Sequence, residues 1–446
     1  MHAVEKLLQT APPVDVSDPV ALREYIVGEL GAAGVLLKPA EKRGVYGADE
    51  RLAEWQLDKK VTRDRAEVLE SAIDYIRRGN SHHTGRHGYA ATWAAPGSGK
   101  THLLDAIVIA MQTRGDMHFV PIPLTFNGKM NDTTVGVRGL LARMLCAHFV
   151  GVSKRFTTVF PKFIKLVDAL RVDKVATLVA AIKCDVAAAR RVNAADVVPV
   201  LLVDEIRLSA TNERADNVRV VYNALMGSLA DYRVVVTSLD PTTVRPHAAN
   251  MQASCSNMPI TWLPLKRLRT DDWEKSDNRV LARLVAMAAG HPRTMAAVID
   301  FVRDRDASQV LLDLHKIAGS DEDFHMTWSF LVPALTGKTM YRDDRFGDST
   351  TFERAVAGGA LQNACKDDMA LAAQVPQPSL FALYAHAKKL EKTASDLAAK
   401  CIVSIVSRVV SSITGFESVH AHWHALIVTL FARRDEHLSL RLVAHE

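Results

Sequence analysis

The segment Ala94–Thr101, Ala-Ala-Pro-Gly-Ser-Gly-Lys-Thr, constrains the fold of this chain more than any other. A short β-prone run, Tyr89–Ala94, leads into it, and Lys100–Thr113 follows it with apolar residues on one helical side. A strand, a glycine-rich turn and a helix start direct several backbone N–H groups at one point, which suits a phosphate. Lys100 would then neutralise the β- and γ-phosphates of a nucleotide, and the Thr101 hydroxyl would hold Mg²⁺.

The loop departs from the usual phosphate-loop pattern at one position. Ala94 stands where G-x-x-x-x-G-K-[ST] has its first glycine, but Gly97 and Gly99 remain to form the tight turn. We therefore predict ATP as the ligand. The residues expected to bind it, including one from a later strand, are Ala95, Pro96, Gly97, Ser98, Gly99, Lys100, Thr101, His102 and Ser238. The alternative is a Gly-Ser surface turn that happens to precede a lysine.

A second signal is an apolar run that ends in two carboxylates. Val197–Val203 is almost entirely aliphatic, as strands buried on both faces of a parallel sheet are, and Asp204 and Glu205 follow it. Ligands bind at the carboxyl ends of strands in open α/β sheets. We therefore expect Asp204 to position Mg²⁺ and Glu205 to polarise the attacking water.

A third strand is expected to end beside the same site. Arg233–Ser238 is β-branched and finishes in two hydroxyls, those of Thr237 and Ser238. In ATPases of the AAA+ and STAND types, a polar residue at this point senses the γ-phosphate, and either hydroxyl could do so here. The alternative is that they only cap the end of the strand.

An arginine outside the sheet is a further candidate. Gly290–Arg293 reads Gly-His-Pro-Arg and opens a helix expected over Thr294–Val302, where Pro292 suits the first turn. Arg293 resembles the second sensor of AAA+ proteins, and an arginine there can stabilise charge on a transferring phosphoryl group. The alternative is a surface arginine near a helix start. Arg245 is a weaker candidate for an arginine that acts on a neighbouring subunit.

The spacing of these segments predicts the fold class and the domains. With Phe119–Phe126 and Pro259–Leu265, five β-rich runs alternate with helical stretches, which indicates an α/β P-loop NTPase with a parallel sheet and helices on both faces. The expected parts are an N-terminal helical segment at 1–87, the NTPase core at 88–270 with a helical insertion at about 151–196, a helical lid at 271–326, a winged-helix-like domain at 327–386 and a C-terminal helical segment at 387–446.

Four short motifs of the chain resemble one family. Pro-Ile-Pro-Leu-Thr-Phe-Asn127, Leu-Val-Asp-Glu205, Val-Thr-Ser238 and Gly-His-Pro-Arg293 together are similar to the NTPase module of Crinkler effectors and retrotransposon hot spot proteins, over roughly residues 60 to 430. Glu353–Leu361, with Pro376–Phe381, is similar in layout to the winged-helix segment of that module. The resemblance implies an ATPase that drives a conformational switch. Family members often carry a nuclease domain, and Gly415–Glu417 resembles its opening, but no Asp…Glu-x-Lys core follows.

Composition and charge indicate which partners and which cellular compartment to expect. The formal net charge is +5 with the basic residues spread along the chain, so a nucleic-acid partner is only weakly indicated, and a protein partner or a second copy is the other expectation. Five scattered cysteines without a C-x-x-C pair indicate neither disulfides nor zinc. We see no signal peptide and no apolar run of about 18 residues, so we expect an intracellular protein, cytoplasmic or nuclear, without a membrane span.

These observations lead to one reading of the function and two alternatives. The first is Mg²⁺-dependent ATP hydrolysis coupled to a conformational change; a kinase is disfavoured because no acceptor site accompanies the loop. The second is a nucleotide-binding interaction or effector protein with little hydrolysis. The third is the NTPase part of a nuclease effector whose nuclease domain is incomplete.

Overall fold

The computed structural model describes two compact units of the 446-residue chain, and each is treated by itself. The first comprises Met1–Gln56, Arg65–Trp93 and Lys100–Leu263, and the second comprises Leu57–Asp64, Ala94–Gly99 and Pro264–Glu446. The described residues are 12–46, 65–79, 88–94, 97–115, 118–126, 136–152, 156–206, 215–238 and 260–265, then the later elements named below and a few isolated positions.

A parallel sheet is the centre of the first unit. Its strands are β1 (Tyr89–Trp93), β2 (Phe119–Thr125), β3 (Val198–Asp204), β4 (Arg233–Ser238) and β5 (Ile260–Trp262), in the order β2-β3-β4-β1-β5. Each neighbouring pair runs parallel. The sheet expected from the five β-rich runs is confirmed, and β1 to β4 are almost entirely buried, as strands covered on both faces are, whereas the edge strand β5 is half-buried.

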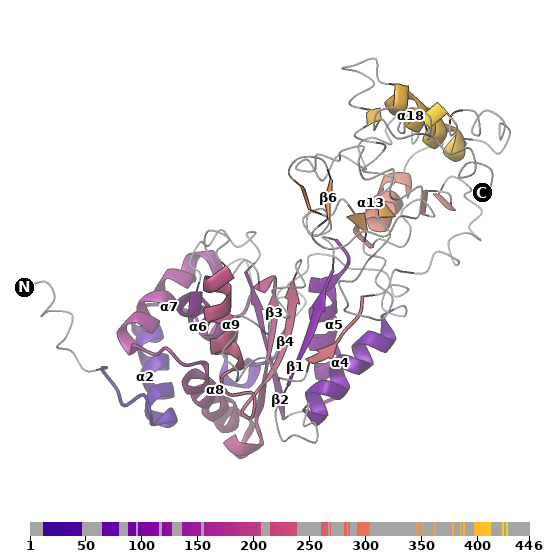
Figure 1. Cartoon of the computed structure of the whole chain (residues 1–446). Coiled ribbons are helices and arrows are strands. Elements are labelled where there is room, and N and C mark those ends of the chain that lie inside the picture. Colours follow the sequence, from indigo (N-terminus) through magenta and orange to yellow (C-terminus); the bar gives the residue numbers. More distant parts are fainter. Residues whose placement is uncertain are drawn as a thin grey trace, which may run out of the picture. The chain divides into compact units, whose positions relative to one another are not determined.

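Helices cover both faces of this sheet. The helices of the first unit are α2 (Pro19–Ala32), η1 (Ala40–Lys42), α4 (Ala66–Arg78), α5 (Lys100–Thr113), α6 (Gly136–Phe149), α7 (Phe156–Leu170), α8 (Val175–Arg190), η4 (Ala194–Asp196) and α9 (Ala215–Met226). Figure 1 shows α6, α8 and α9 on one face, and α4 and α5 on the other. Right-handed crossovers account for this, because the chain crosses the sheet one way from β1 to β2 and returns from β2 to β3.

The sequence of β2 suits its place at an edge of the sheet. The N–H of Phe126 donates to the carbonyl of Asp204 on β3 at 3.1 Å, so even-numbered residues of β2 donate inward and odd-numbered ones face outward. Pro121 and Pro123 occupy two outward positions, where a missing N–H removes no ladder hydrogen bond. These prolines also prevent the edge from pairing with a further strand.

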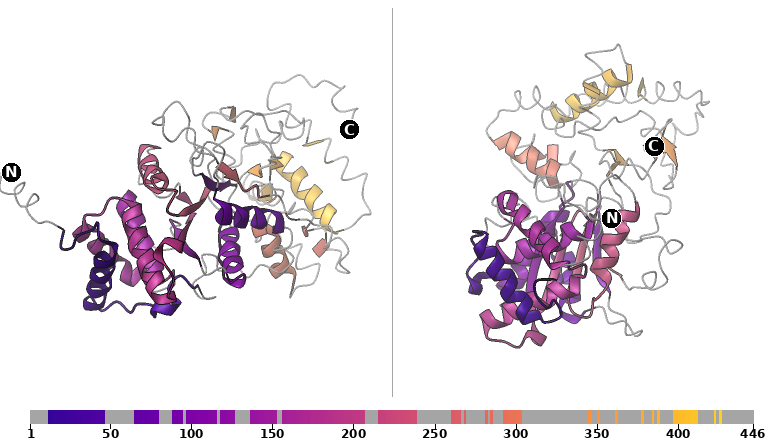
Figure 2. Two further views of the ribbon diagram at one scale, coloured as in Figure 1. Left: turned by 90° about the horizontal axis from the view of Figure 1, so that it is seen from below. Right: turned by 90° about the vertical axis from the view of Figure 1, so that its left-hand side faces the viewer.

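Residues 12–46 pack over this edge and against helices α7 and α8. Helix α2 lies against α7 and α8, as the views of Figure 2 also show. Further along, the N–H of Lys38 donates to the carbonyl of Phe149 at 2.8 Å. Gly44 has φ 75°, and a Cβ there would lie only 2.6 Å from a methyl of Val120 on β2. Only glycine allows the chain to approach the strand so closely.

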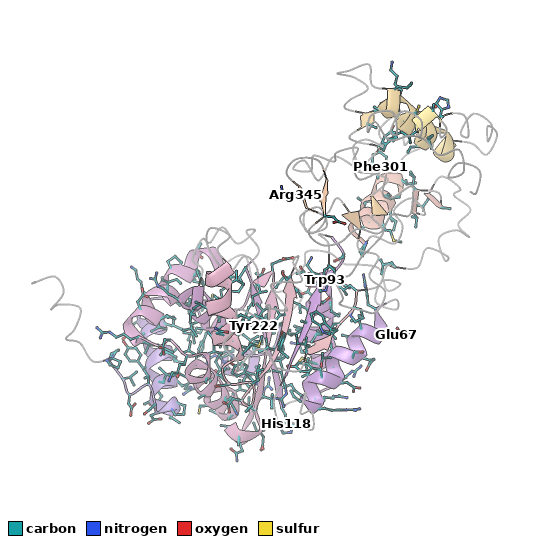
Figure 3. All side chains as sticks on the ribbon, in the orientation of Figure 1. Glu67, Trp93, His118, Tyr222, Phe301 and Arg345 are labelled. Carbon is teal, nitrogen blue, oxygen red and sulfur yellow. The ribbon has the colours of Figure 1, made fainter. Side chains whose placement is uncertain are left out.

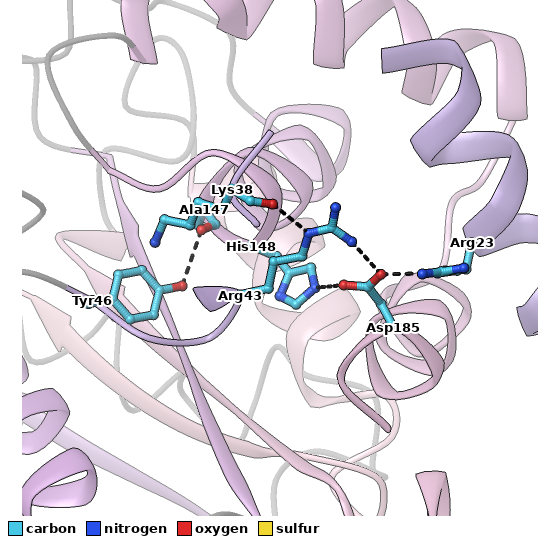
Figure 4. Close-up of polar contacts among 7 residues, drawn as sticks. All are labelled: Arg23, Lys38, Arg43, Tyr46, Ala147, His148 and Asp185. Carbon is cyan, nitrogen blue, oxygen red and sulfur yellow. Dashed lines mark hydrogen bonds and ion pairs between the residues drawn. The ribbon is translucent and has the colours of Figure 1, made fainter. Parts of the chain in front are cut away.

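A buried carboxylate on α8 joins residues 12–46 to the core of the first unit. Asp185 of α8 is fully buried and accepts hydrogen bonds from Arg23 Nε at 3.0 Å, Arg43 Nη1 at 2.6 Å and the His148 ring at 2.9 Å (Figure 4). The two arginines come from the N-terminal segment and His148 comes from α6. Buried charges persist when they are paired, so this cluster fixes the N-terminal segment to the core.

The second unit contains α13 (Pro292–Arg303), α18 (Leu397–Ser411) and two short antiparallel pairs, β6 (Arg345–Phe346) with β7 (Thr350–Thr351) and β8 (Leu361–Gln362) with β9 (Gln377–Pro378). Pro292 opens α13, as the Gly-His-Pro-Arg motif predicts. Most of the residues expected to form the lid and the winged-helix-like domain lie outside those described, so both remain predictions. Within the described parts of the chain, no helix has the length and apolarity to cross a membrane.

Candidate functional site

The predicted site residues of the first unit gather where the parallel strands end. Trp93, the last residue of β1, lies at the carboxyl end of the sheet, whereas His118, just before β2, lies at the opposite end (Figure 3). Because all five strands run in one direction, Asp204 and Thr237 share the carboxyl end with Trp93. This is the end at which open α/β sheets bind ligands.

The two glycines of the glycine-rich turn have backbone angles that suit a tight turn. Gly97 and Gly99 have φ 78° and 96°, a region that favours glycine. Ala94 is buried, and its φ is not positive, so the alanine in place of the first glycine causes no backbone strain. The turn leads directly into α5, which begins at Lys100. Ala95 and Pro96 lie outside the described residues.

Asp204 is a fully buried carboxylate surrounded by hydroxyl groups. Thr101 Oγ1 lies 3.2 and 3.1 Å from its two oxygens, Thr237 Oγ1 donates to Oδ1 at 2.9 Å, and Thr125 Oγ1 donates to Oδ2 at 3.4 Å. Burial, and then the charge of Glu205, raise the pKa of Asp204 to about 6, against the lowering effect of the hydroxyls and Lys100.

Thr125 is a member of the site for which the sequence analysis predicted no role, although it lies in the Pro-Ile-Pro-Leu-Thr-Phe-Asn motif. It faces Asp204 in the register of β2 and β3, and Thr92 faces Thr237 in the register of β1 and β4. Val203 pairs with Val236, so Asp204 and Thr237 stand one step further along the same two strands. In-register residues of parallel strands point to the same face. Four neighbouring strands therefore present one polar row, which only the strand order could have revealed.

Lys100 and Glu205 are paired with each other. Lys100 Nζ lies 3.3 Å from Glu205 Oε1, with the two side chains 4% and 11% exposed. Glu205 has φ 54°, which is uncommon outside glycine, and its N–H donates to Thr237 Oγ1 at 3.1 Å. Its second carboxylate oxygen, Oε2, is buried without a hydrogen-bond partner among the described residues.

The remaining predicted residues are distributed as follows. Ser238 is fully buried but points to the opposite face from Thr237, since side chains alternate along a strand, so Thr237 is the hydroxyl that contacts Asp204. His102 is half-buried in the first turn of α5. Arg293 is the second residue of α13, in the other unit. Arg245 lies outside the described residues.

The site suits a metal ion that is held partly by its substrate. The described part of the chain contains no group of three or more His, Cys, Asp and Glu side chains able to hold a metal by themselves. Asp204 and Thr101 instead place hard oxygen donors 3.1 to 3.2 Å apart. Mg²⁺ prefers such ligands and commonly takes one or two from the protein and the others from phosphates and water.

Several solved structures are similar to this chain, and two of them are described below. No protein-family model matches the chain, and no curated protein is significantly similar to it. A Walker-type ATPase of Pyrococcus abyssi matches with 11% identity and a TM-score of 0.44, over 76% of this chain and 98% of that chain. Drosophila ORC bound to DNA matches with 14% identity and a TM-score of 0.31, over 94% of this chain and 90% of that chain.

Proposed function

We propose that this protein binds ATP with Mg²⁺ and hydrolyses it. The observation that carries the proposal is the contact between Thr101, at the start of the helix after the glycine-rich turn, and Asp204, at the end of β3. A hydroxyl and a carboxylate from these two positions form the protein side of a magnesium–nucleotide site. The positive φ angles of Gly97 and Gly99 support the same proposal, since a tight phosphate-binding turn needs glycine at such positions.

Each residue has a proposed role. Lys100 and the N–H groups at the start of α5 would bind the phosphates, with the turn residues, His102 and Ser238 as further contacts. Thr101 and Asp204 would hold Mg²⁺, which supplies neutralisation of the negative charge on the β- and γ-phosphates. Glu205 would orient the attacking water and accept its proton.

A slowly hydrolysing nucleotide switch is the second candidate. The Lys100–Glu205 pair favours it, because a general base held by a lysine is less available to water. Phosphate release from ATP, with Mg²⁺ and with excess EDTA, separates the two. An ATPase releases phosphate in repeated turnovers that EDTA stops. A switch of the second kind binds ATP by calorimetry but releases phosphate no faster than a protein-free blank.

We also propose that nucleotide binding and hydrolysis drive a conformational change. We infer that ATP and ADP favour different conformations of the protein, as the resemblance to Crinkler and retrotransposon hot spot NTPases implies. A protein partner, a second copy or nucleic acid would respond to the change. Limited proteolysis and size-exclusion chromatography with ATP and with ADP test it, and identical patterns for both nucleotides would exclude a switch.

A further inference from the structure

We propose that Thr237 is a positioning residue that holds the main chain of Glu205 in its left-handed conformation, and so fixes where the Glu205 carboxylate stands. The inference rests on the proposed function, because Glu205 is the residue assigned to the attacking water. In this role Thr237 contacts the backbone of Glu205, whereas a γ-phosphate sensor would contact the nucleotide directly.

The conformation of Glu205 requires a local cause. Three non-glycine residues among those described have positive φ: Arg171, Arg191 and Glu205. Arg171 and Arg191 directly follow the last residues of α7 and α8, where a left-handed residue commonly ends a helix. Glu205 instead follows a buried strand, where no helix end favours this conformation. A contact with another residue must therefore hold Glu205 in this conformation.

The hydroxyl of Thr237 is placed to do this. Its oxygen accepts the Glu205 N–H at 3.1 Å, and its proton is donated to Asp204 Oδ1 at 2.9 Å. A hydroxyl has one proton to donate, so the bond to Asp204 orients the lone pairs towards the Glu205 amide. Thr237 is fully buried, and Glu205 is 8% exposed. Without this hydroxyl, the Glu205 N–H would lose its acceptor in a place with little access to water.

The backbone conformation decides the direction of the side chain. A change of φ from the left-handed to the extended region would turn the Cα–Cβ bond of Glu205 away from its present direction. The carboxylate that now lies 3.3 Å from Lys100 Nζ would then leave the phosphate-binding lysine. Thr237 therefore affects the reaction only through the position of Glu205. Thr237 itself is held in place by β4, which pairs with β3.

Three variants test the inference. Thr237→Val removes the hydroxyl with little change in volume, and Thr237→Ser keeps it. Thr92→Val is the matched control, because Thr92 belongs to the same polar row, is 1% exposed and has a hydroxyl without a hydrogen-bond partner in the described part of the chain. If Thr237→Val gives no folded protein, Thr237→Ala removes the same hydroxyl without placing a methyl against the carboxylate.

The first measurement does not depend on hydrolysis. Amide hydrogen exchange at Glu205, followed without nucleotide, should be faster by about tenfold or more in Thr237→Val, because one hydrogen bond of roughly 1.4 kcal/mol is lost. Thr237→Ser and Thr92→Val should exchange like the wild type. Unchanged protection in Thr237→Val would overturn the inference, whether or not the protein hydrolyses ATP. A wild type that does not hydrolyse ATP would overturn only the proposed function.

The second measurement separates a positioning role from general structural damage. In Thr237→Val we expect kcat to fall by about tenfold or more with ATP affinity nearly unchanged, and Thr237→Ser to restore it. In the Glu205→Gln background the same valine substitution should have no further effect on kcat, because it acts through Glu205. Equal losses in both backgrounds, or no rescue by serine, would contradict the inference.

Discussion

The Nζ atom of Lys100 lies 3.3 Å from Oε1 of Glu205, and both side chains are almost excluded from solvent. The proposed phosphate-binding residue is thus paired with the proposed general base. Under these proposed roles, a phosphate that binds Lys100 would compete with this carboxylate and release Glu205 towards water. The pair would then link nucleotide binding to the availability of the base.

Glu205→Gln should separate binding from hydrolysis. The amide cannot accept a proton from water, so turnover should fall by roughly 10²-fold or more. ATP affinity should stay equal or rise, because the neutral side chain competes less for Lys100. Calorimetry and steady-state phosphate release measure the two effects, with Glu29→Gln on the exposed face of α2 as the control. Turnover at the wild-type rate would show that Glu205 is not the base.

Lys100→Ala should abolish ATP binding while the fold is kept. The substitution removes the charge expected to neutralise the phosphates. Helix α5 should stay folded, because its buried apolar residues after Lys100 are unchanged. Calorimetric titration with ATP and far-UV circular dichroism check both parts of this prediction. Lys165→Ala, an exposed lysine of α7, is the control and should bind like the wild type. Retained affinity in the Lys100 variant would refute the phosphate assignment.

Asp204→Asn should stabilise the nucleotide-free protein at neutral pH. Burial raises the pKa of Asp204 to about 6 from 3.8, so the folded state favours the protonated acid. The stabilisation is therefore complete below pH 3.8 and is lost as the pH rises through 6. At pH 7 the neutral amide avoids this cost, which the pKa difference puts at up to about 3 kcal/mol.

Denaturant unfolding between pH 4 and pH 8 checks this prediction. The stability advantage of Asp204→Asn over the wild type should grow through pH 5 to 7 and be small at pH 4. Magnesium–ATP should stabilise the wild type but not the variant, since ligand binding adds to stability only where the site is intact. A constant difference across the pH range would show that the charge of Asp204 is not the source of the effect.

The sequence predicted the parallel sheet and placed the phosphate loop, the acidic pair and the Thr237–Ser238 strand end at one site, but it did not indicate every side chain that contacts Asp204. The apolar run before Asp204 and the glycine pattern before Lys100 each follow from local spacing, so the strands and the turn were predictable. Thr125 lies within the Pro-Ile-Pro-Leu-Thr-Phe-Asn motif, but no role was predicted for it, because its contact with Asp204 depends on β2 and β3 being neighbours. The choice between Thr237 and Ser238 likewise depends on which face of β4 meets Asp204.

Arg293→Ala should lower hydrolysis more than it lowers ADP affinity. If its guanidinium stabilises charge on the γ-phosphate, ADP lacks the group that it would contact, and the loss should fall on ATP turnover by about tenfold or more. Its position in the first turn of α13 agrees with the motif. The affinities for ATP and ADP and the turnover rate of the Arg293→Ala variant test this prediction. Equal losses for both nucleotides would indicate a structural role.

Asp185→Asn should destabilise the first unit much more than a comparable change at the surface. Asp185 is fully buried between Arg23, Arg43 and His148, and loss of its charge leaves two guanidinium groups without their carboxylate. Removing one partner of a buried ion pair costs about 3–5 kcal/mol.

The exposed Arg138–Asp168 pair provides the matched control for this change. It also joins an arginine and an aspartate of two elements, but its side chains are 52% and 47% exposed, so Asp168→Asn should cost less than about 1 kcal/mol. Urea unfolding of the two variants beside the wild type measures the difference. Because the arginines of the Asp185 cluster lie in the N-terminal segment, that segment should also become more sensitive to proteolysis in Asp185→Asn. Equal stability of the two variants would show that the cluster does not hold the N-terminal segment in place.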